Sequence, residues 1–231
     1  MNEPEPARRR APQKRSLRTH EAILEAAGQV FDEHGYVGAT LKMILSRTGG
    51  EVTKGGLYHH FRSKEQLAQE IMQIQVPMST LPAQQSKIQE LVDTSFFFVF
   101  LLLNNPLARA GARLSTDGGL PPSLDATGVF RAWASHAELL IRQAAELKQT
   151  LPGTEPDQIS EVLVGSYVGI QLTSKAFDDR RELPRRISLF WRLILPGIAA
   201  PGLLPTIDYA PDRMDRLFPA NSANEAGTDE P

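Results

Sequence analysis

The chain contains no cysteine among its 231 residues. This absence excludes disulfide bonds, thiolate metal sites and cysteine nucleophiles, and it fits a protein of the reducing cytoplasm. Long apolar runs are also missing, because the strongest one, Phe96–Leu103, is far shorter than the roughly 20 residues that a membrane-spanning helix needs. The opening residues "MNEPEPARRRAPQKR" lack the apolar core of a secretory signal. We therefore expect a folded cytoplasmic protein without a membrane span.

Catalytic signatures are absent as well. The five histidines show no H-E-x-x-H spacing, and the chain has neither a G-x-S-x-G nucleophile turn nor a phosphate-binding P-loop. The adjacent His59 and His60 would point to different sides of a helix, which argues against a shared metal ion. We predict no enzymatic activity, no metal site and no cofactor.

Charge is distributed unevenly. The formal net charge is −2, yet residues 7–66 hold eleven Lys and Arg against six Asp and Glu, a balance of +5 that leaves −7 for the rest. A basic segment on an acidic body is typical of a nucleic-acid reader whose body avoids non-specific binding. A solvated charged arm would give the same asymmetry. The basic cluster Arg8–Arg15 either adds contacts to phosphates or a minor groove, or is solvating disorder.

Apolar residues recur with helical spacing, and no segment alternates with the period of two that is typical of a strand. We therefore predict an all-α fold. It would comprise a disordered basic arm at 1–15, a three-helix helix-turn-helix domain at 16–62, a larger helical body at 63–218 that opens with a connecting helix at 63–76, and a disordered tail at 219–231. The further body helices are expected near 87–103, 107–114, 124–149, 156–176 and 185–195.

The helix-turn-helix is predicted from caps and glycines. Thr19 opens a helix that ends at Gly35, Thr40 and Thr53 cap two shorter helices, and Ser63 with a Gln three residues later forms a capping box. The small core of this domain is expected to consist of Leu41, Ile44, Leu45, Val52, Leu57 and Phe61.

Residues outside this core suit contact with a DNA duplex. Threonine hydroxyls at helix starts suit phosphate oxygens, and Lys54 can reach the O6 and N7 atoms of guanine in the major groove. Gly55 and Gly56 each cost a helix about 1 kcal/mol relative to alanine, but the missing Cβ lets backbone approach backbone. An ordinary helical hairpin with exposed polar residues is the alternative. The predicted DNA-binding residues are Thr40, Lys42, Thr53, Lys54, Gly55, Gly56, Tyr58, His59 and Lys64.

The head segments "ILEAAGQVFDEHGY", "AT" and "VTKGGLYHHFRSKEQLA", followed by a helical body, resemble the TetR family of bacterial repressors. "FRAW", "GIQLTSKAF" and "LPRRISLFWRLILPG" resemble the γ-butyrolactone-receptor-type regulators of actinomycetes. The resemblance covers almost the whole chain after residue 16. It implies a dimer that represses at a pseudo-palindromic operator on double-stranded DNA until a butyrolactone-, butenolide- or furan-type signal releases it, and it implies control of secondary-metabolite or antibiotic genes. One departure is the turn "TGGEV", which is longer than the family pattern and either enlarges only the turn or changes how the recognition helix sits in the groove.

The resemblance also implies a small hydrophobic ligand in the body. Trp133 matches the tryptophan that lines the pocket of these receptors, while Gln75 and Val168 match positions close to the ligand. Two polar residues one helical turn apart, Tyr167 and Gln171, would suit a mostly apolar cavity. The predicted ligand-binding residues are Gln75, Phe97, Phe130, Trp133, Tyr167, Val168 and Gln171. Plain core packing is the alternative for the apolar members of this set.

The last two long helices, near 156–176 and 185–195, carry small and apolar residues, and the resemblance implies that they form the homodimer interface. Two other functions stay open at this point. One is a TetR-like pseudo-receptor or efflux regulator that senses an antibiotic or another hydrophobic drug. The other is a helical adaptor whose head binds a protein.

Overall fold

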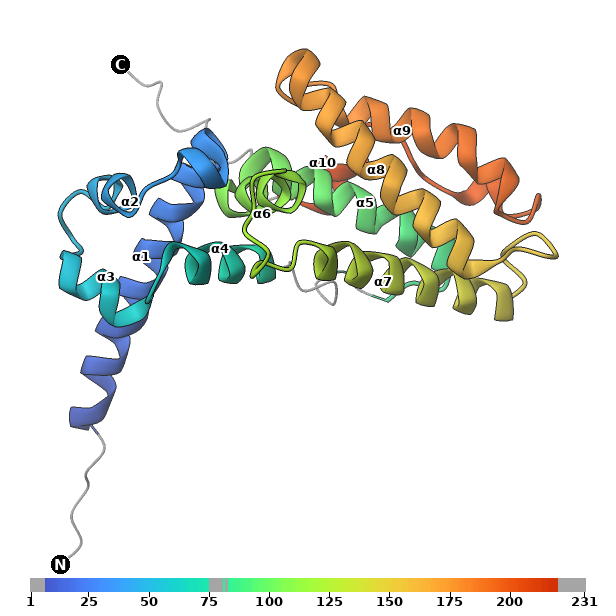
Figure 1. Ribbon diagram of the computed structural model, residues 1–231. Helices are drawn as coiled ribbons and strands as arrows, with labels where there is room; N and C mark the ends of the chain where they lie inside the picture. Colours follow the sequence, from blue (N-terminus) through green and yellow to red (C-terminus); the bar gives the residue numbers. More distant parts are fainter. Residues whose placement is uncertain (1–6, 75–80, 82, 220–231) are drawn as a thin grey trace, which may run out of the picture. The chain divides into compact units, whose positions relative to one another are not determined.

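The structure is a computed structural model that describes residues 7–74, 81 and 83–219. Within these residues the chain has helices and one isolated β-bridge, between Thr150 and Ala199, and no strand (Figure 1). The predicted all-α fold is confirmed. The chain divides into two compact units: a head unit, Met1–Val76 with Asn104–Val129, and a body unit, Pro77–Leu103 with Phe130–Pro231.

Helix α1 (Ala7–Gly38) begins earlier than the sequence predicts. Residues 7–15, which were expected to be disordered, belong to this helix; their Ala, Arg, Gln and Lys are good helix formers, whereas Pro12 is not. The predicted end at Gly35 is confirmed as a break: Gly35 has φ 67° and ψ −176°, and only a short turn follows it to Gly38.

Three further short helices follow in the head unit: α2 (Leu41–Arg47), α3 (Lys54–His60) and α4 (Lys64–Gln73). Each begins at its predicted cap, since the side chains of Thr40, Thr53 and Ser63 accept hydrogen bonds from the third residue of their helices at 3.1–3.2 Å. The capping box differs in one detail. The side chain of Gln66 accepts from the backbone N–H of Arg62 at 2.8 Å, one residue before the cap.

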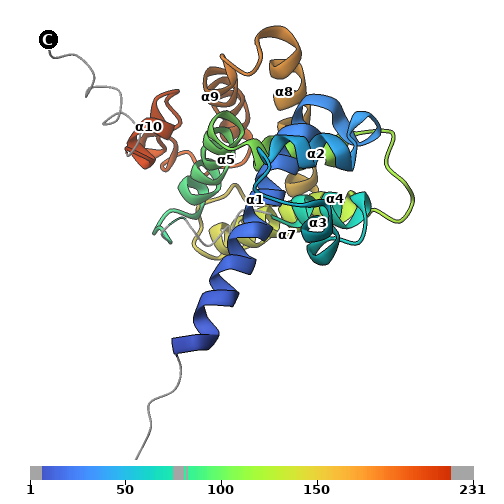
Figure 2. The ribbon, with the colours of Figure 1, turned by 90° about the vertical axis from the view of Figure 1, so that its left-hand side faces the viewer.

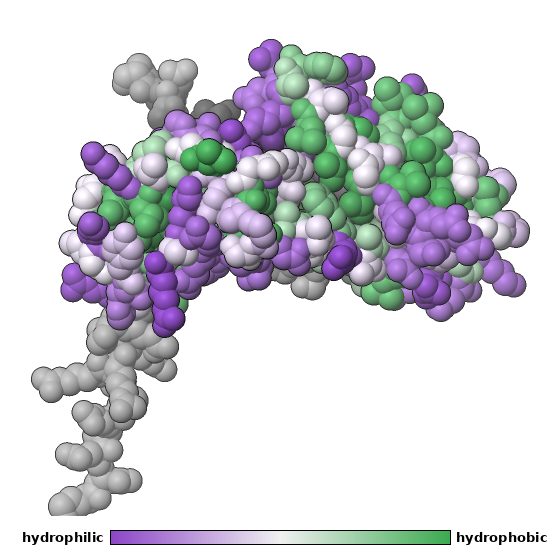
Figure 3. Space-filling model, in the orientation of Figure 1, coloured by the Kyte–Doolittle hydropathy of each residue, from purple (hydrophilic) through white to green (hydrophobic). Residues whose placement is uncertain are grey.

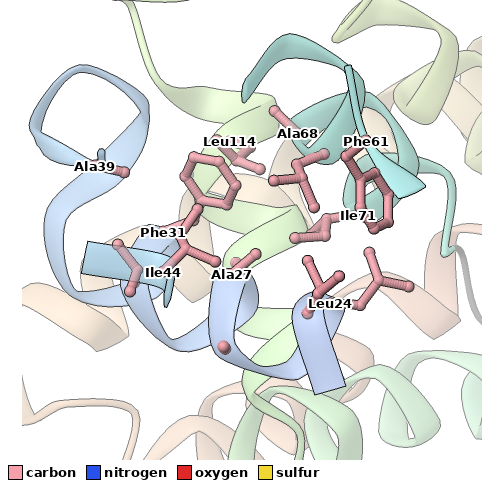
Figure 4. Packing of buried hydrophobic residues seen from close by; sticks show 14 of the residues in the cluster. Leu24, Ala27, Phe31, Ala39, Ile44, Phe61, Ala68, Ile71 and Leu114 are labelled. Carbon is pink, nitrogen blue, oxygen red and sulfur yellow. The ribbon is translucent and has the colours of Figure 1, made fainter. Parts of the chain in front are cut away.

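The head core gathers residues from α1, α2, α3 and α4 around Phe31, which is fully buried (Figure 4). Of the six core residues predicted from sequence, Ile44, Val52, Leu57 and Phe61 are buried, and Leu41 and Leu45 lie half-buried against the same cluster. This packing fixes the orientation of α2 and α3 on α1.

A fifth helix, α6 (Pro106–Thr116), also belongs to the head unit, although the expected division placed it with the body. It packs on α1 more extensively than α2 does, and its Leu114 enters the head core. The Nε atom of Arg109 lies 2.6 Å from a carboxylate oxygen of Asp32 on α1. Asp117, just after α6, accepts from the backbone N–H of Tyr36 at 2.9 Å.

The body unit is built on α5 (Lys87–Asn104), with α7 (Thr127–Glu146), α8 (Pro156–Asp178) and α9 (Leu183–Ile194). Short 3-10 turns at Leu195–Gly197 and Leu204–Thr206 lead to α10 (Arg213–Leu217). Helix α5 is buried over most of its surface, as its apolar sequence predicts, with Val92, Phe96 and Val99 fully inside.

No individual helix in the described ranges has the length and apolar character to cross a membrane; α5 and α6 reach that level only when they are taken together, by length and composition alone. The predicted disordered tail at 219–231 lies outside the described residues except for Pro219.

Candidate nucleic-acid interface and ligand site

Helix α3 separates into a buried side and an exposed side. Leu57 is fully buried in the head core, whereas Lys54 and Tyr58, one turn apart, are exposed, Tyr58 by 47%. The predicted DNA-contacting residues Thr40, Lys42, Thr53, Gly55 and His59 are also exposed, and Gly56 and Lys64 are half-buried. Figure 2 views the molecule from the side on which α2 and α3 lie in front of α1. The structure therefore leaves most of the predicted set accessible, on α2, α3 and the residues that cap them.

The two glycines of α3 differ in their surroundings. A Cβ atom on Gly55 would meet only the Thr53 hydroxyl oxygen, at 4.0 Å, and neither glycine has a positive φ. At Gly56 a Cβ would approach the same oxygen to 3.3 Å and Val52 to 3.6 Å. Packing of the head thus restricts residue 56 but leaves room for a Cβ atom at residue 55.

The lengthened turn between α2 and α3 contains two glycines of a different kind. Gly49 and Gly50 have φ values of 63° and 88°, in the left-handed region where a side chain is strained, and both are exposed. The turn keeps its form through hydrogen bonds from the N–H groups of Gly49 and Glu51 to the carbonyls of Ser46 and Thr48.

The cap threonines remain able to donate. Each hydroxyl oxygen accepts a backbone N–H of its own helix, at 3.2 Å for Thr40 and 3.1 Å for Thr53, and a hydroxyl keeps its own proton for a further acceptor. Both residues are exposed. The two helix starts therefore present hydrogen-bond donors at the surface of the head.

Lys64 is engaged inside the head. Its Nζ donates to the backbone carbonyls of Tyr36 at 2.9 Å and Ala39 at 3.0 Å, and it lies 4.2 Å from the centre of the Tyr36 ring. The Tyr36 hydroxyl donates to Glu65 at 2.8 Å, and burial together with this carboxylate raises the pKa of Tyr36 to about 12. These contacts tie the start of α4 to the end of α1.

Three histidine rings lie together beside α3. The His60 ring is 5.8 Å from the His20 ring and 5.3 Å from the His59 ring. Burial lowers the pKa of His60, and repulsion from the other two histidines adds to the effect. His20 also lies 3.0 Å from Glu70 on α4. Across the described ranges no group of three or more His, Cys, Asp or Glu side chains could hold a metal ion.

In the body unit, aromatic rings from three helices meet. The ring of Phe98 on α5 contacts that of Trp133 on α7 at an interplanar angle of 63°, and its centre lies 5.8 Å from that of Tyr167 on α8. Two of the predicted ligand-binding residues, Trp133 and Tyr167, thus share a neighbour that sequence reasoning did not select. The apolar run around Phe98 marked the helix, but it did not reveal which of its sides faces α7 and α8.

The other predicted ligand-binding residues are dispersed. Phe97 is buried against Phe218, with ring centres 5.1 Å apart, and Gln171 is buried with its amide oxygen 3.4 Å from the Arg180 guanidinium. Phe130 and Val168 are half-buried. Gln75 lies outside the described residues.

His136, which the sequence did not single out, lies one turn after Trp133 on α7. Its Nε2 atom is buried and makes no hydrogen bond among the described residues, and the same is true of the Tyr167 hydroxyl oxygen. Burial lowers the pKa of His136 and raises that of Tyr167. The sequence does not indicate that a single histidine on a helix is buried, because its burial depends on how the helices pack.

Comparison with known proteins agrees with the description of the head unit and with that of the body unit. Residues 23–71 match the family of bacterial regulatory proteins of the tetR type, and residues 85–200 match the tetracyclin repressor-like C-terminal domain. The chain is 38% identical over 197 residues to the A-factor receptor protein of Streptomyces griseus, covering 85% of this chain and 70% of that one. The chain belongs to the TetR family.

Solved structures of TetR proteins share the fold. The full-length TetR regulator tylP of Streptomyces fradiae superimposes with a TM-score of 0.79 at 32% identity, covering 88% of this chain and 97% of that one. A γ-butyrolactone receptor, an ArpA-like protein, superimposes with a TM-score of 0.67 at 26% identity, covering 88% and 99%. The resemblance to γ-butyrolactone-receptor-type TetR regulators is confirmed. These relatives are regulators rather than enzymes.

Proposed function

We propose that this TetR protein is a cytoplasmic repressor that binds a pseudo-palindromic operator as a homodimer and leaves it when a small butyrolactone-type signal fills the body unit. The genes that it controls would belong to secondary metabolism or antibiotic production. The likeness to the A-factor receptor and to a γ-butyrolactone receptor supports the ligand class. The exposed side of α3 supports operator binding.

The observation that carries the DNA-binding role is Gly55. This residue is exposed within a helix, where glycine is unfavourable, and no neighbour in the head excludes a Cβ atom from it. Folding therefore gives no reason for glycine at this position. Close approach of the α3 backbone to a DNA groove does give one, and Lys54 beside it supplies a charge that can reach base edges or phosphates.

The test is the Gly55→Ala variant. Because alanine is the better helix former, we expect the free energy of unfolding to stay equal or rise by up to about 1 kcal/mol. We expect affinity for a duplex, selected from a random pool by the wild-type protein, to fall tenfold or more as measured by fluorescence anisotropy. Gly118→Ala, at an exposed glycine outside α3, is the control and should keep wild-type affinity.

If a well-folded Gly55→Ala variant kept wild-type affinity for the duplex, the proposal that the α3 backbone approaches a DNA groove would be wrong. Salt titration separates a DNA reader from an adaptor that binds protein, because neutralised phosphates make the logarithm of the binding constant fall steeply with the logarithm of salt concentration.

Homodimerisation is proposed through α8 and α9. Apolar side chains stand exposed along both helices, among them Val162 at 56%, Phe177 at 76% and Leu193 at 68%, and Figure 3 shows apolar surface (green) over this region. A two-fold dimer presents two heads to the two halves of a palindrome.

Release by ligand requires that the ligand bind the operator-free state more tightly than the operator-bound state. Adding butyrolactones to the protein–duplex complex should therefore lower the anisotropy. Release by a hydrophobic antibiotic, with no effect of any butyrolactone, would instead favour a drug-sensing regulator.

A further inference from the structure

The first turns of α1 project beyond the rest of the head unit. The first buried residue of α1 in the head core is Ile23, whereas Arg15 and Arg18 are exposed. Figures 1 and 2 show this part of α1 extending past α3, with no other described helix of the head unit beside it. Residues 7–18 are helical, so at a rise of about 1.5 Å per residue they extend the head by about 18 Å.

This projecting segment is strongly basic. Residues 7–18, "ARRRAPQKRSLR", hold six Lys and Arg and no Asp or Glu. Arg18 follows Lys14 by four residues and Arg15 by three, and like charges at these spacings destabilise a helix. Neither Arg15 nor Arg18 forms an ion pair within the described part of the chain. Folding of the head therefore gives no reason for this charge, whereas a polyanion beside the helix would offset the repulsion.

The segment begins beside the end of α3. The His20 ring is 5.8 Å from the ring of His60, the last residue of α3, and 4.9 Å from that of Phe61, which follows it. The residues before His20 therefore leave the head next to the helix that is proposed to approach a DNA groove. Since base pairs are about 3.4 Å apart along the duplex, the length of the segment corresponds to roughly five base pairs.

We propose that residues 7–18 bind the phosphate backbone of the DNA that flanks the operator, and that Arg15 and Arg18 supply two of these contacts in each protomer. This inference rests on the proposed function, because it requires α3 to bind operator DNA. A helix with its side chains is about 10–12 Å wide, whereas the minor groove of B-DNA is about 6 Å wide. The helical form therefore favours phosphates over insertion into the minor groove. Because phosphate contacts carry no sequence information, the flanks can have any sequence.

The experiment compares two duplexes by fluorescence anisotropy. The short duplex ends with the outermost base pairs that selection by the wild-type protein fixes, and the long duplex adds about ten base pairs of arbitrary sequence on each side, enough to accept the segment. We expect the wild type to bind the long duplex about tenfold more tightly than the short one. In the double variant Arg15→Gln/Arg18→Gln this ratio of affinities should fall to about twofold, because phosphate contacts are lost.

Salt titration on the long duplex gives a second readout. Loss of two phosphate contacts per protomer, four per dimer, should reduce the slope of the logarithm of the binding constant against that of the salt concentration by about 3–4. Arg131→Gln/Arg142→Gln, which removes the same charge from exposed residues of α7, is the matched control. It should keep the wild-type ratio and slope. Circular dichroism checks that both variants are folded.

The outcomes separate this inference from the proposed function. If the wild type binds both duplexes equally well, or if the Arg15/Arg18 variant keeps the wild-type ratio and slope, the flanking contact is refuted and operator binding by α3 stands. An equal loss in the α7 variant would also refute it, since net charge alone would then explain the effect. A gain that changes with the flank sequence would overturn the phosphate assignment, because it would show base reading. If the wild type selects no duplex, the DNA-binding role fails and this inference fails with it.

Discussion

At the scale of single residues, Lys64 has contacts inside the head that differ from the phosphate contact predicted for it. Its position at the start of α4 predicts a phosphate contact, yet its ammonium group donates to two backbone carbonyls and lies over the Tyr36 ring. Both carbonyls lie at the end of α1, where the chain turns toward α2. Lys64 therefore acts as an internal brace of the head.

We expect Lys64→Met to lower the free energy of unfolding by about 1–3 kcal/mol, because two carbonyls lose a charged donor. Urea unfolding followed by circular dichroism measures this loss. Lys42→Met, at an exposed lysine of α2, is the control and should change the stability by less than about 0.5 kcal/mol. Equal stability of the two variants, together with weaker DNA binding by Lys64→Met than by the wild type, would restore the phosphate role.

His60 makes the stability of the head depend on pH. Its pKa is lowered in the folded state, so below the ordinary value of about 6.5 the unfolded chain binds more protons than the folded one. The contribution of His60 to the free energy of unfolding is then fully present above this pH, and it is lost as the pH falls through and below it. His136 acts in the same direction in the body unit.

The His60→Gln variant should show a smaller loss of unfolding free energy between pH 7 and pH 5 than the wild type. Urea titrations at several pH values measure this slope. His34→Gln, at an exposed histidine of α1, serves as the control and should retain the wild-type slope. A wild-type slope in His60→Gln would mean that other groups dominate the acid response.

At the scale of elements, α10 is fastened to α5 by a buried ion pair. The guanidinium of Arg213 makes a two-pronged contact with Asp93, at 2.9 and 2.7 Å, and the Asp93 side chain is completely buried. Gln89 donates to the same carboxylate at 2.8 Å. This ion pair holds the segment after the 3-10 turn Leu204–Thr206 against α5, the central helix of the body unit.

Arg213→Met should lower the free energy of unfolding by about 3–5 kcal/mol, since it leaves a buried carboxylate without its cation. The neighbouring Arg216 is a matched control, because the side chains of its partners Asp208 and Asp212 keep 37% and 63% of their surface exposed, and Arg216→Met should cost about 1 kcal/mol or less. Thermal and urea unfolding of both variants give the comparison. Similar losses in the two would show that burial of Asp93 does not matter.

At the scale of the whole molecule, the exposed apolar side chains of α8 and α9 allow a test of the proposed homodimer. Leu193→Glu should produce monomers, because two copies of the new charge would meet at a self-complementary interface. Sedimentation velocity measures the change of mass. Affinity for a palindromic duplex should drop about 100-fold, since two linked heads bind far more tightly than one.

Leu147→Glu is the matched control for this experiment. Leu147 is 55% exposed, comparable with Leu193 at 68%, but lies just after α7. It should remain a dimer with unchanged affinity. If the Leu193→Glu protein remained a dimer, the dimer interface would have to lie on another surface.

Local signals in the sequence determined much of the head. The caps at Thr40, Thr53 and Ser63, the break at Gly35 and the buried side of α3 all depend on residues within a few positions of one another, so they can be read without a structure. The family resemblance likewise depends on linear segments. Helix α1 is the exception, because its helical start at Ala7 follows from continuation of a distant helix and not from a local cap.

Only the tertiary structure decided which surfaces meet. It placed α6 in the head unit, set the ammonium group of Lys64 against two backbone carbonyls, turned Phe98 and not Phe97 toward Trp133, and buried Nε2 of His136. Adjacent residues on a helix differ by about 100° in direction, so an apolar run does not tell which member faces a neighbour. That choice comes from how whole helices dock, and docking joins residues that are far apart in the chain.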